Sequence, residues 1–447
     1  MVALMQQDLA GLAKRIRAAL PKPRKMGKNV VQLMANGDLR LAANQRCWDE
    51  QVKLEAALTQ VIEEMGYTVV RVHAYDPQLG HGFIQRQRQG LDVFKDIDPD
   101  APLIIAEAVW EYSHHILDGL LDHRGPILIV ANWSGTWPGL VGASNLNACL
   151  AKFGKPASFL WSEDFSDKWF RRKLKKWLET GKVIQHDRRH VRRFKPSTGG
   201  IYDVGAAVAD SIAVERPIAG CFDERCMGMV NAVFEDEHLH QLRISREPMS
   251  QSALYYETMQ VSDAEAEEVV RWWEDRGLTF KFGTDEQTEL TRAQVLLQAK
   301  MYIAAVRIAD DFGCAVIGIQ YQQGLKDLLP ASDLVEGTLN TTDRPPVKSR
   351  DGKRVLFEGE SVPCANEVDW GAFTGGLLIK RLHAALGQEE DNTQHDLRWG
   401  DIDRSGTVDD YVWVFLLSGS VPASHFPRSW QDGSSERQPG MYFRLGG

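Results

Sequence analysis

The stretch TRAQVLLQAKMYIAAVRIADDFGCAVIGI, residues 291–319, decides the fold class. Its first part repeats apolar residues at helical spacing, which predicts a helix over 291–312. Gly313 follows, and glycine commonly ends a helix because it adopts the left-handed conformation without strain. The run 315–319 is short, apolar and uncharged, which is typical of a buried strand. A long helix that leads directly into a buried strand indicates an α/β protein.

The same alternation of helices and strands recurs upstream. Apolar residues at helical spacing predict a helix over 49–65, and a serine N-cap with Glu265 three residues later predicts another over 262–276. Strand-like runs lie at 67–72, 102–105, 126–131 and 217–221. Alternating strands and helices indicate mainly parallel sheets with helices on their faces.

The length of the chain predicts more than one domain. At 447 residues it exceeds the roughly 250–300 residues at which single hydrophobic cores stop growing. The Arg-Pro-Pro sequence at 344–346 interrupts regular structure. Beyond it, the strand-like run 412–417 is followed by many turn-forming residues. We therefore expect two α/β segments and a last segment that mixes strands and turns.

The composition excludes several classes of protein. Lys plus Arg is 52 and Asp plus Glu is 61, a net charge of −9, which argues against a general nucleic-acid binder. The longest apolar run is far shorter than the roughly 20 residues of a membrane-spanning helix. The 6 cysteines form no Cys-x-x-Cys pair, and the N-terminus lacks the apolar core of a secretory signal. We therefore expect a soluble cytoplasmic protein with reduced thiols.

One stretch of the chain is strongly basic. Lys and Arg are frequent between residues 168 and 195, where the only acidic residues are Glu179 and Asp187. Such a run is commonly the solvated face of a helix and its following loop. The alternative is a binding site for an anionic ligand.

Three stretches in the last third of the chain carry carboxylates, amides and one histidine beside predicted strands. They lie at 317–340, 363–372 and 418–426. Their Glu336, Glu367 and His425 form a set of two carboxylates and one imidazole, which suits Mn²⁺, Mg²⁺ or Co²⁺ better than soft metals. The large separations along the chain leave simpler interpretations open. Glu367 could be a charge at the start of a helix, and His425 an ordinary loop histidine.

These stretches resemble the L-fucose isomerase and L-arabinose isomerase superfamily. The segment Glu336-Gly-Thr-Leu-Asn is similar to a Glu-x-Leu-Leu-Asn-like segment of the L-fucose branch. Glu367 lies before a Gly-Ala dipeptide, and His425 follows a strand and a glycine-containing turn, as the other two ligands do there. Upstream, 225–229 (Arg-Cys-Met-Gly-Met) and 132–139 (Asn-Trp-Ser-Gly-Thr-Trp-Pro-Gly) are similar to the family's Ser-Met-Gly-Met and Asn-Gly-Thr-x-x-Pro-Gly loops.

The resemblance implies a fold and a reaction. The fold would be two Rossmann-like α/β domains, residues 1–190 and 191–344, followed by a β-rich C-terminal domain, residues 345–447. The reaction would be a Mn²⁺-dependent aldose–ketose isomerisation through an enediol, with Mg²⁺ or Co²⁺ as alternative metals. Family members bind substrate between subunits, so the resemblance also implies a homo-oligomer, a trimer or a hexamer.

The resemblance also assigns roles to individual residues. Glu336 and Glu367 would be both catalytic acid/base groups and metal ligands, and His425 would be the third ligand. Gln320 and Asn366 would orient these groups or contact the substrate. Three further residues are substrate-contacting candidates without such a match: Trp133 and Trp137 would form an apolar wall against the sugar, and Arg225 would bind an anionic substrate. For the two tryptophans, ordinary core packing is the alternative.

The substrate class stays open between three alternatives. The first is a neutral pentose or deoxyhexose such as arabinose or fucose. The second is an anionic sugar such as a sulfonated hexose, held by Arg225 or by the basic stretch 168–195 through charged hydrogen bonds. The third is a sugar-binding protein without catalysis, against which the presence of both carboxylates and the histidine argues. The chain is shorter than L-fucose isomerases and has Glu367 where that branch has Asp.

Overall fold

The computed structural model describes residues 9–132, 139–184, 195, 198–224, 227–322, 324–393, 396–408, 410–416, 421–437 and 441–445. The contacts between residues divide the chain into two compact units, Met1–Arg192 and Arg193–Gly447. Both contain parallel sheets with helices on their faces, which confirms the α/β class. The expected count of three domains is not confirmed, and a boundary at residue 344 stays a prediction.

The first unit has a five-stranded parallel sheet in the order β2-β1-β3-β4-β5. Its strands are β1 (Val30–Met34), β2 (Thr68–Arg71), β3 (Leu103–Glu107), β4 (Ile127–Asn132) and β5 (Ser158–Ser162). The strand-like runs expected in this part of the sequence coincide with β2, β3 and β4. Because all five strands run in the same direction, their carboxyl ends meet at one edge of the sheet.

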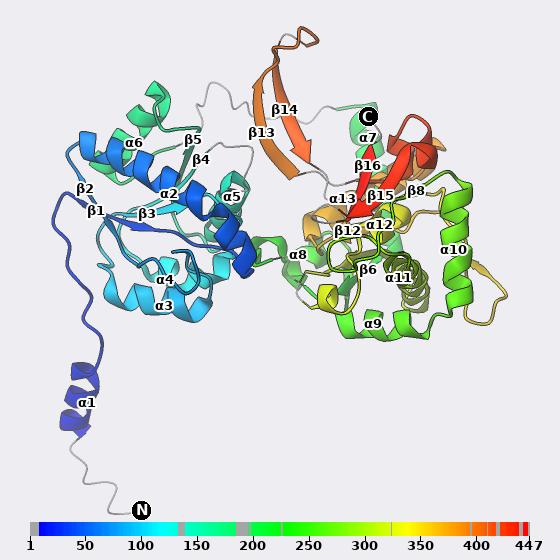
Figure 1. Ribbon diagram of the computed structural model, residues 1–447, viewed down its shortest axis with the longest axis horizontal. Helices are drawn as coiled ribbons and strands as arrows, with labels where there is room; N and C mark the ends of the chain where they lie inside the picture. The colour runs from blue at the N-terminus through cyan, green and yellow to red at the C-terminus, as the bar shows by residue number, and fades with distance from the viewer. Residues whose placement is uncertain are drawn as a thin grey trace, which may run out of the picture. The chain divides into compact units, whose positions relative to one another are not determined.

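Helices cover both faces of this sheet (Figure 1). On one face lie α2 (Leu41–Glu64) and α6 (Lys168–Thr180), and on the other lie α3 (Gln87–Asp96), α4 (Leu117–Asp122) and α5 (Gly139–Lys152). Leu58 of α2, Ile104 of β3 and Trp177 of α6 belong to one buried apolar cluster. Apolar residues from helix and sheet together therefore form the core that holds the strands in place. The short helix α1 (Leu9–Ala18) precedes the sheet.

Helix α6 accounts for part of the basic stretch. Phe170, Leu174 and Trp177 are buried, whereas Lys168 and Lys175 are exposed. For this helix the basic residues are therefore the solvated face of an amphipathic element. The positions 185–194 of the basic stretch lie outside the described residues.

The second unit has a four-stranded parallel sheet in the order β12-β9-β6-β7. Its strands are β6 (Ile218–Phe222), β7 (Ser245–Met249), β9 (Cys314–Ile319) and β12 (Cys364–Asn366). Strand β9 is the buried strand expected after Gly313. Strand β12 comes from the region expected to form a separate C-terminal domain, yet it pairs with β9 and completes this sheet.

Helices also cover both faces of the second sheet. One core cluster includes residues of α9 (Gln251–Gln260), α10 (Asp263–Asp275), α11 (Arg292–Asp311) and α12 (Asp333–Leu339). The other includes residues of α7 (Gly200–Glu215), α8 (Asp236–Gln241) and α13 (Trp370–Leu386). Helix α10 begins with the expected capping box of Ser262 and Glu265, and α11 begins with a second one, formed by Thr291 and Gln294.

Short strands and 3-10 helices complete the chain. The strands are β8 (Thr279–Phe280), β10 (Val347–Lys348), β11 (Val355–Leu356), β13 (Asp396–Ile402), β14 (Tyr411–Leu416), β15 (Gly433–Arg437) and β16 (Met441–Leu445). The 3-10 helices are η2 (Ser113–His115), η3 (Val230–Ala232), η4 (Leu325–Asp327), η5 (Ala423–His425) and η6 (Ser429–Asp432). The last hundred residues thus contain several strands but also the 17-residue helix α13.

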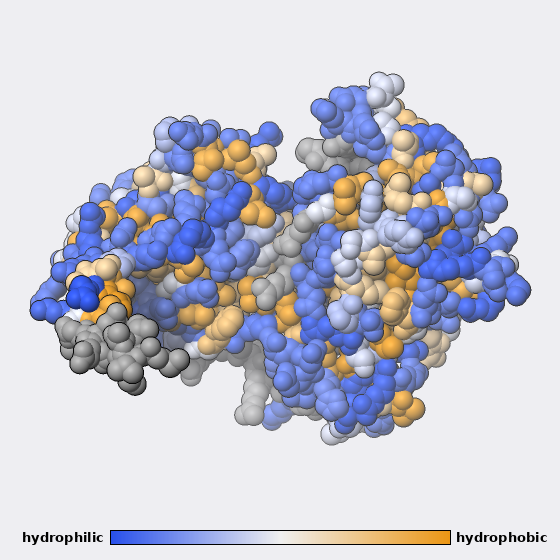
Figure 2. Space-filling view, turned by 90° about the horizontal axis from the view of Figure 1, so that it is seen from below, coloured by the Kyte–Doolittle hydropathy of each residue, from blue (hydrophilic) through white to orange (hydrophobic). Residues whose placement is uncertain are grey.

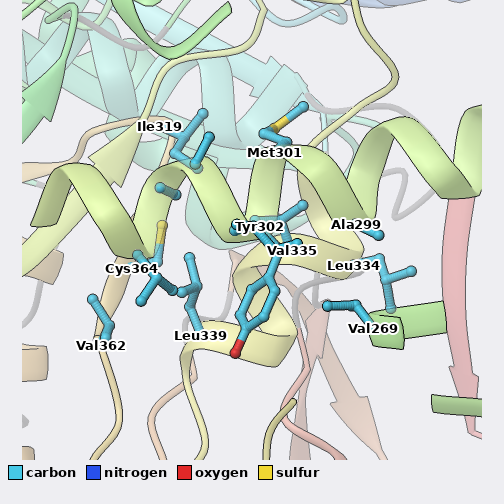
Figure 3. Close-up of a cluster of buried hydrophobic side chains, with 14 of the residues drawn as sticks. Val269, Ala299, Met301, Tyr302, Ile319, Leu334, Val335, Leu339, Val362 and Cys364 are labelled. Atoms are coloured by element: carbon cyan, nitrogen blue, oxygen red, sulfur yellow. The ribbon is translucent and has the colours of Figure 1, made fainter. Parts of the chain in front are cut away.

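Packing around α11 fixes the position of α12. Met301 and Tyr302 of α11 lie in one cluster with Leu334, Val335 and Leu339 of α12 (Figure 3). The hydroxyl of Tyr302 donates to the backbone oxygen of Pro345 over 2.6 Å, which satisfies a polar group inside the apolar core. Every residue of α12 is buried, so this helix is held from all sides.

The surface is mixed in character. The face shown in Figure 2 is mostly hydrophilic, with apolar residues interspersed. Within the described ranges, no helix combines the length and apolar character needed to cross a membrane. The cysteines at 47, 149, 221, 314 and 364 are buried, and none of these five is in a disulfide bond.

Two glycine substitutions test the packing of α13 on the second sheet. A Cβ at Gly318 of β9 would lie 2.4 Å from the Phe373 ring of α13, whereas a Cβ at Gly375 of α13 would meet no atom within 4 Å. We expect Gly318→Ala to lower the free energy of unfolding by about 1–3 kcal/mol. Gly375→Ala should leave it unchanged or raise it by up to about 1 kcal/mol, because alanine favours the helix. Chemical denaturation measures both, and equal stability of the two variants would contradict this packing.

Candidate functional site

Carboxyl and amide side chains gather at the carboxyl edge of the second sheet. Gln320 follows β9 directly, and Glu367 follows β12. Since these two strands are adjacent and parallel, the residues that follow them lie at the same edge. Glu336 comes from α12, which lies against β12. Three segments that are distant in sequence therefore bring polar side chains together at this edge.

Glu336 is fully buried and held by two donors. The hydroxyl of Ser332 donates to its Oε1 over 2.6 Å, and Nδ2 of Asn366 donates to its Oε2 over 2.5 Å. Both carboxyl oxygens therefore have a fixed position. From the sequence, we expected Asn366 to contact or orient the substrate. In the structure it donates a hydrogen bond to Glu336, the expected catalytic carboxyl.

Glu367 lies on an unusual stretch of backbone. Its φ is 53° and that of Val368 is 64°, the left-handed region that a β-branched residue rarely adopts. Such strain persists only where the surroundings hold the backbone, and it is concentrated at functional sites. Here β12 precedes the pair, and after Asp369 the buried Trp370 begins α13.

Hydrogen bonds through two glutamine residues connect the end of β9 to Glu367. Nε2 of Gln322 donates to Oε1 of Glu367 over 2.8 Å. The backbone N–H of Gln322 in turn donates to Oε1 of the fully buried Gln320 over 2.8 Å. Gln251 donates from Nε2 to the backbone oxygen of Gln320. Gln320 is therefore placed to position Gln322 and, through it, Glu367.

Burial and mutual repulsion shift the acidity of two carboxyls on α12. Burial raises the pKa of Glu336 to about 7, the hydrogen bonds from Ser332 and Asn366 oppose this, and the charge of Glu367 adds to it. Burial, followed by the charges of Glu336 and Glu367, raises the pKa of Asp333 well above its ordinary value. In the described part of the chain, neither Asp333 nor Glu336 forms an ion pair with Lys or Arg. The site therefore concentrates acidic groups without a basic counter-charge on Asp333 and Glu336.

Asp333 is a site residue that the sequence interpretation did not single out. It precedes Glu336 by three positions, and residues three apart lie on the same side of a helix. This spacing was present in the sequence. It is not distinctive, however, until α12 is known to be buried along its whole length.

His425 differs from the buried Glu336 because its side chain is exposed. It is exposed at the end of η5, although its neighbours Ala423 and Phe426 belong to the buried cluster that contains α12. Among the described residues, no group of three or more His, Cys, Asp or Glu side chains is arranged to hold a metal ion. The structure therefore does not bring Glu336, Glu367 and His425 together as a metal triad, and the triad stays a prediction.

Three expected substrate-contacting residues, Trp133, Trp137 and Arg225, lie outside the described residues. No known protein-family model matches the chain, and no curated protein matches it. The function is therefore inferred from the residues and geometry of the chain itself.

The buried carboxyls predict an unusual dependence of stability on pH in metal-free protein. Because the pKa of Glu336 is about 7 in the folded protein against 4.5 ordinarily, the folded state binds more protons between these pH values. Stability should then fall as the pH rises through this window, by about 3 kcal/mol for this group. Glu336→Gln should remove that part of the dependence.

Denaturation at pH 4.5 to 8 in the presence of a chelator measures this effect. Glu358→Gln is the matched control, because Glu358 is exposed. An unchanged pH dependence in Glu336→Gln would show that Glu336 is not buried as described.

Proposed function

We propose that the protein is a metal-dependent aldose–ketose isomerase, which interconverts an aldose and its 2-ketose through an enediol. The observation that carries this proposal is the carboxyl cluster of Asp333, Glu336 and Glu367 at the carboxyl edge of a parallel sheet. Ligands of open α/β sheets bind at this edge. The resemblance of the three stretches to the sugar isomerase superfamily agrees with the same reaction.

The acidity of Glu336 suits the proton transfer that isomerisation requires. A group that takes a proton from C2 of the aldose and returns it to C1 of the enediol must both accept and donate at neutral pH. A pKa of about 7 for Glu336, raised by burial, meets this requirement. Glu367 is the candidate for the accompanying proton transfer between O1 and O2.

Hydrogen bonds keep both carboxyls in place before substrate binds. Ser332 and Asn366 hold the two oxygens of Glu336, and Gln322 holds Oε1 of Glu367. Side chains that are already oriented lose little entropy when the substrate arrives. The hydrogen bonds from Gln320 through Gln322 thus position Glu367.

We propose that the carboxyl oxygens of Glu336 and Glu367 hold a hard divalent ion, Mn²⁺ first, with Mg²⁺ or Co²⁺ as alternatives, because such ions prefer oxygen ligands. When bound, such an ion polarises the sugar carbonyl and compensates the negative charge of the enediolate. Burial, and then the charges of Glu336 and Glu367, raise the pKa of Asp333, and a cation would offset those charges. His425 is proposed as the third ligand, on the resemblance alone.

The described side chains favour a neutral sugar over an anionic one. Carboxyls and amides accept and donate hydrogen bonds to sugar hydroxyls, whereas the carboxyl cluster repels an anion. We therefore propose a neutral pentose or deoxyhexose as the substrate.

Glu336→Gln should abolish isomerisation. The change keeps the shape of the side chain but removes its capacity to accept a proton, so kcat/KM should fall by about 10²- to 10⁴-fold or more. Turnover of a panel of neutral aldoses and ketoses with Mn²⁺ measures this, and Glu358→Gln again serves as the exposed control. Near-normal rates in Glu336→Gln would refute the assigned role.

His425→Ala tests the third ligand. If His425 binds the metal, its loss should weaken Mn²⁺ binding by at least about tenfold and lower activity at limiting Mn²⁺. His240→Ala is the matched control, because His240 is also an exposed histidine in a short helical segment. Isothermal titration of chelator-treated protein with Mn²⁺ gives the affinity. If His425→Ala and His240→Ala bind Mn²⁺ equally well, His425 is not a ligand.

A further inference from the structure

A second set of buried carboxyls lies in the first unit, at the place where its strand order changes direction. In the order β2-β1-β3-β4-β5, β2 lies on one side of β1 and β3 lies on the other. The chain therefore builds the sheet first in one direction from β1 and then, through β3, β4 and β5, in the opposite direction. Such a switch point is where open parallel sheets bind ligands. Asn36 follows β1 there, Glu107 ends β3, and Glu111 lies four residues further on.

Glu111 is held in place by neutral donors. Its Oε1 accepts hydrogen bonds from Oγ of Ser113 over 2.5 Å and from Nδ2 of Asn145 over 2.8 Å. Its Oε2 accepts a hydrogen bond from Nδ2 of Asn36. All four residues are buried. A carboxyl that is held by three donors is oriented, and it still has capacity to accept one more partner.

Glu107 is buried with little compensation. It has no exposed surface, and neither of its carboxyl oxygens has a hydrogen-bond partner among the described residues. Burial, together with the charge of Glu111, raises its pKa well above the ordinary value, and the backbone N–H of Asn36 opposes this only in part. A buried carboxyl with no partner is costly, so it requires either a proton or a cation.

Asn36 contributes a third oxygen to the same place. Its Nδ2 donates to Glu111 and, over 3.1 Å, to the backbone oxygen of Tyr112. Its Oδ1 is buried and has no partner within the described ranges. The amide group that orients Glu111 thus leaves its own oxygen unsatisfied beside the carboxyl pair.

The backbone that carries these carboxyls is closely covered. Helix α5 packs closely on the segment from Glu107 to Glu111. A Cβ at Gly139 would lie 2.5 Å from the backbone oxygen of Glu107, and one at Gly142 would lie 2.7 Å from the backbone oxygen of Val109. Helix α5 therefore lies directly against the backbone that carries Glu107 and Glu111.

We propose that Glu107, Glu111 and Asn36 form a cation site, separate from the carboxyl cluster at Glu336, that binds a hard divalent cation. Two carboxylates balance its charge, and all the donors are oxygens, which hard cations prefer. Calcium is favoured over magnesium, because magnesium loses its water shell reluctantly and this site is closed. The bound ion would connect the ends of β1 and β3.

Calcium binding to the full-length protein tests this site independently of the proposed isomerase. Chelator-treated wild type and Glu336→Gln should each bind one Ca²⁺ per chain at this site in equilibrium dialysis, and Glu107→Gln should lose it. Ca²⁺ at about 100-fold over its dissociation constant should raise Tm by about 5 °C in the first two proteins and not in Glu107→Gln. Asp122→Asn, a change at an exposed residue of α4, should behave as wild type.

The alternative occupant of Glu107 is a proton, and the same measurements separate the two. Glutamine has the shape of a protonated glutamic acid. If Glu107 is simply protonated, Glu107→Gln should be as stable as wild type or more so, and Ca²⁺ should have no effect on either. Absence of Ca²⁺ binding to Glu336→Gln would overturn the proposal even if Glu107→Gln failed to fold. Loss of isomerase activity has no bearing on it.

Discussion

The burial of Glu336 is the constraint on which the rest of the site depends. This carboxyl has no exposed surface, because α12 is enclosed on all sides by the core around α11. Removing a carboxyl from water favours its protonated form, and the charge of Glu367 adds to the effect, so the pKa rises to about 7. The hydrogen bonds from Ser332 and Asn366 limit the cost and fix the orientation. Burial of Glu336 thus lowers the stability of the folded protein and leaves a carboxyl that gains and loses its proton near neutral pH.

The parallel sheets explain why the site residues meet although they are far apart in sequence. Glu367 follows β12, Gln320 follows β9, and both strands end at the same edge. The left-handed backbone at Glu367 and Val368 turns the chain sharply between β12 and α13 and places this side chain near Gln322. In the first sheet, Asn36 and Glu107 likewise lie where the neighbouring parallel strands β1 and β3 end. In both units, polar groups that would be unfavourable within the sheet are collected at its carboxyl edge.

Local patterns in the sequence predicted most elements, but not the long-range contacts. The helix at α11, the strand at β9 and the capping box at Ser262 follow from spacing within one segment, which is why they could be read directly. The pairing of β12 with β9 depends on a contact across about fifty residues, and the sequence placed β12 in a separate domain. Glu336 and Asn366 were singled out from the sequence, and the structure joins them. Asp333 and Glu107 became evident only when burial was known, because nothing in their flanking residues distinguishes them from surface carboxyls.

The most direct test of the central claim is the fate of the substrate hydrogen during turnover in D₂O. If Glu336 moves the proton between C2 and C1 through an enediol, part of that proton exchanges with solvent while Glu336 carries it. Wild-type protein with Mn²⁺ should then introduce some solvent deuterium at the carbon that receives the proton. Mass spectrometry of the recovered sugars detects it. Glu336→Gln should introduce none above the level without enzyme. Isomerisation and deuterium incorporation that are the same in wild type and Glu336→Gln, or no isomerisation of any aldose or ketose tested, would contradict the account.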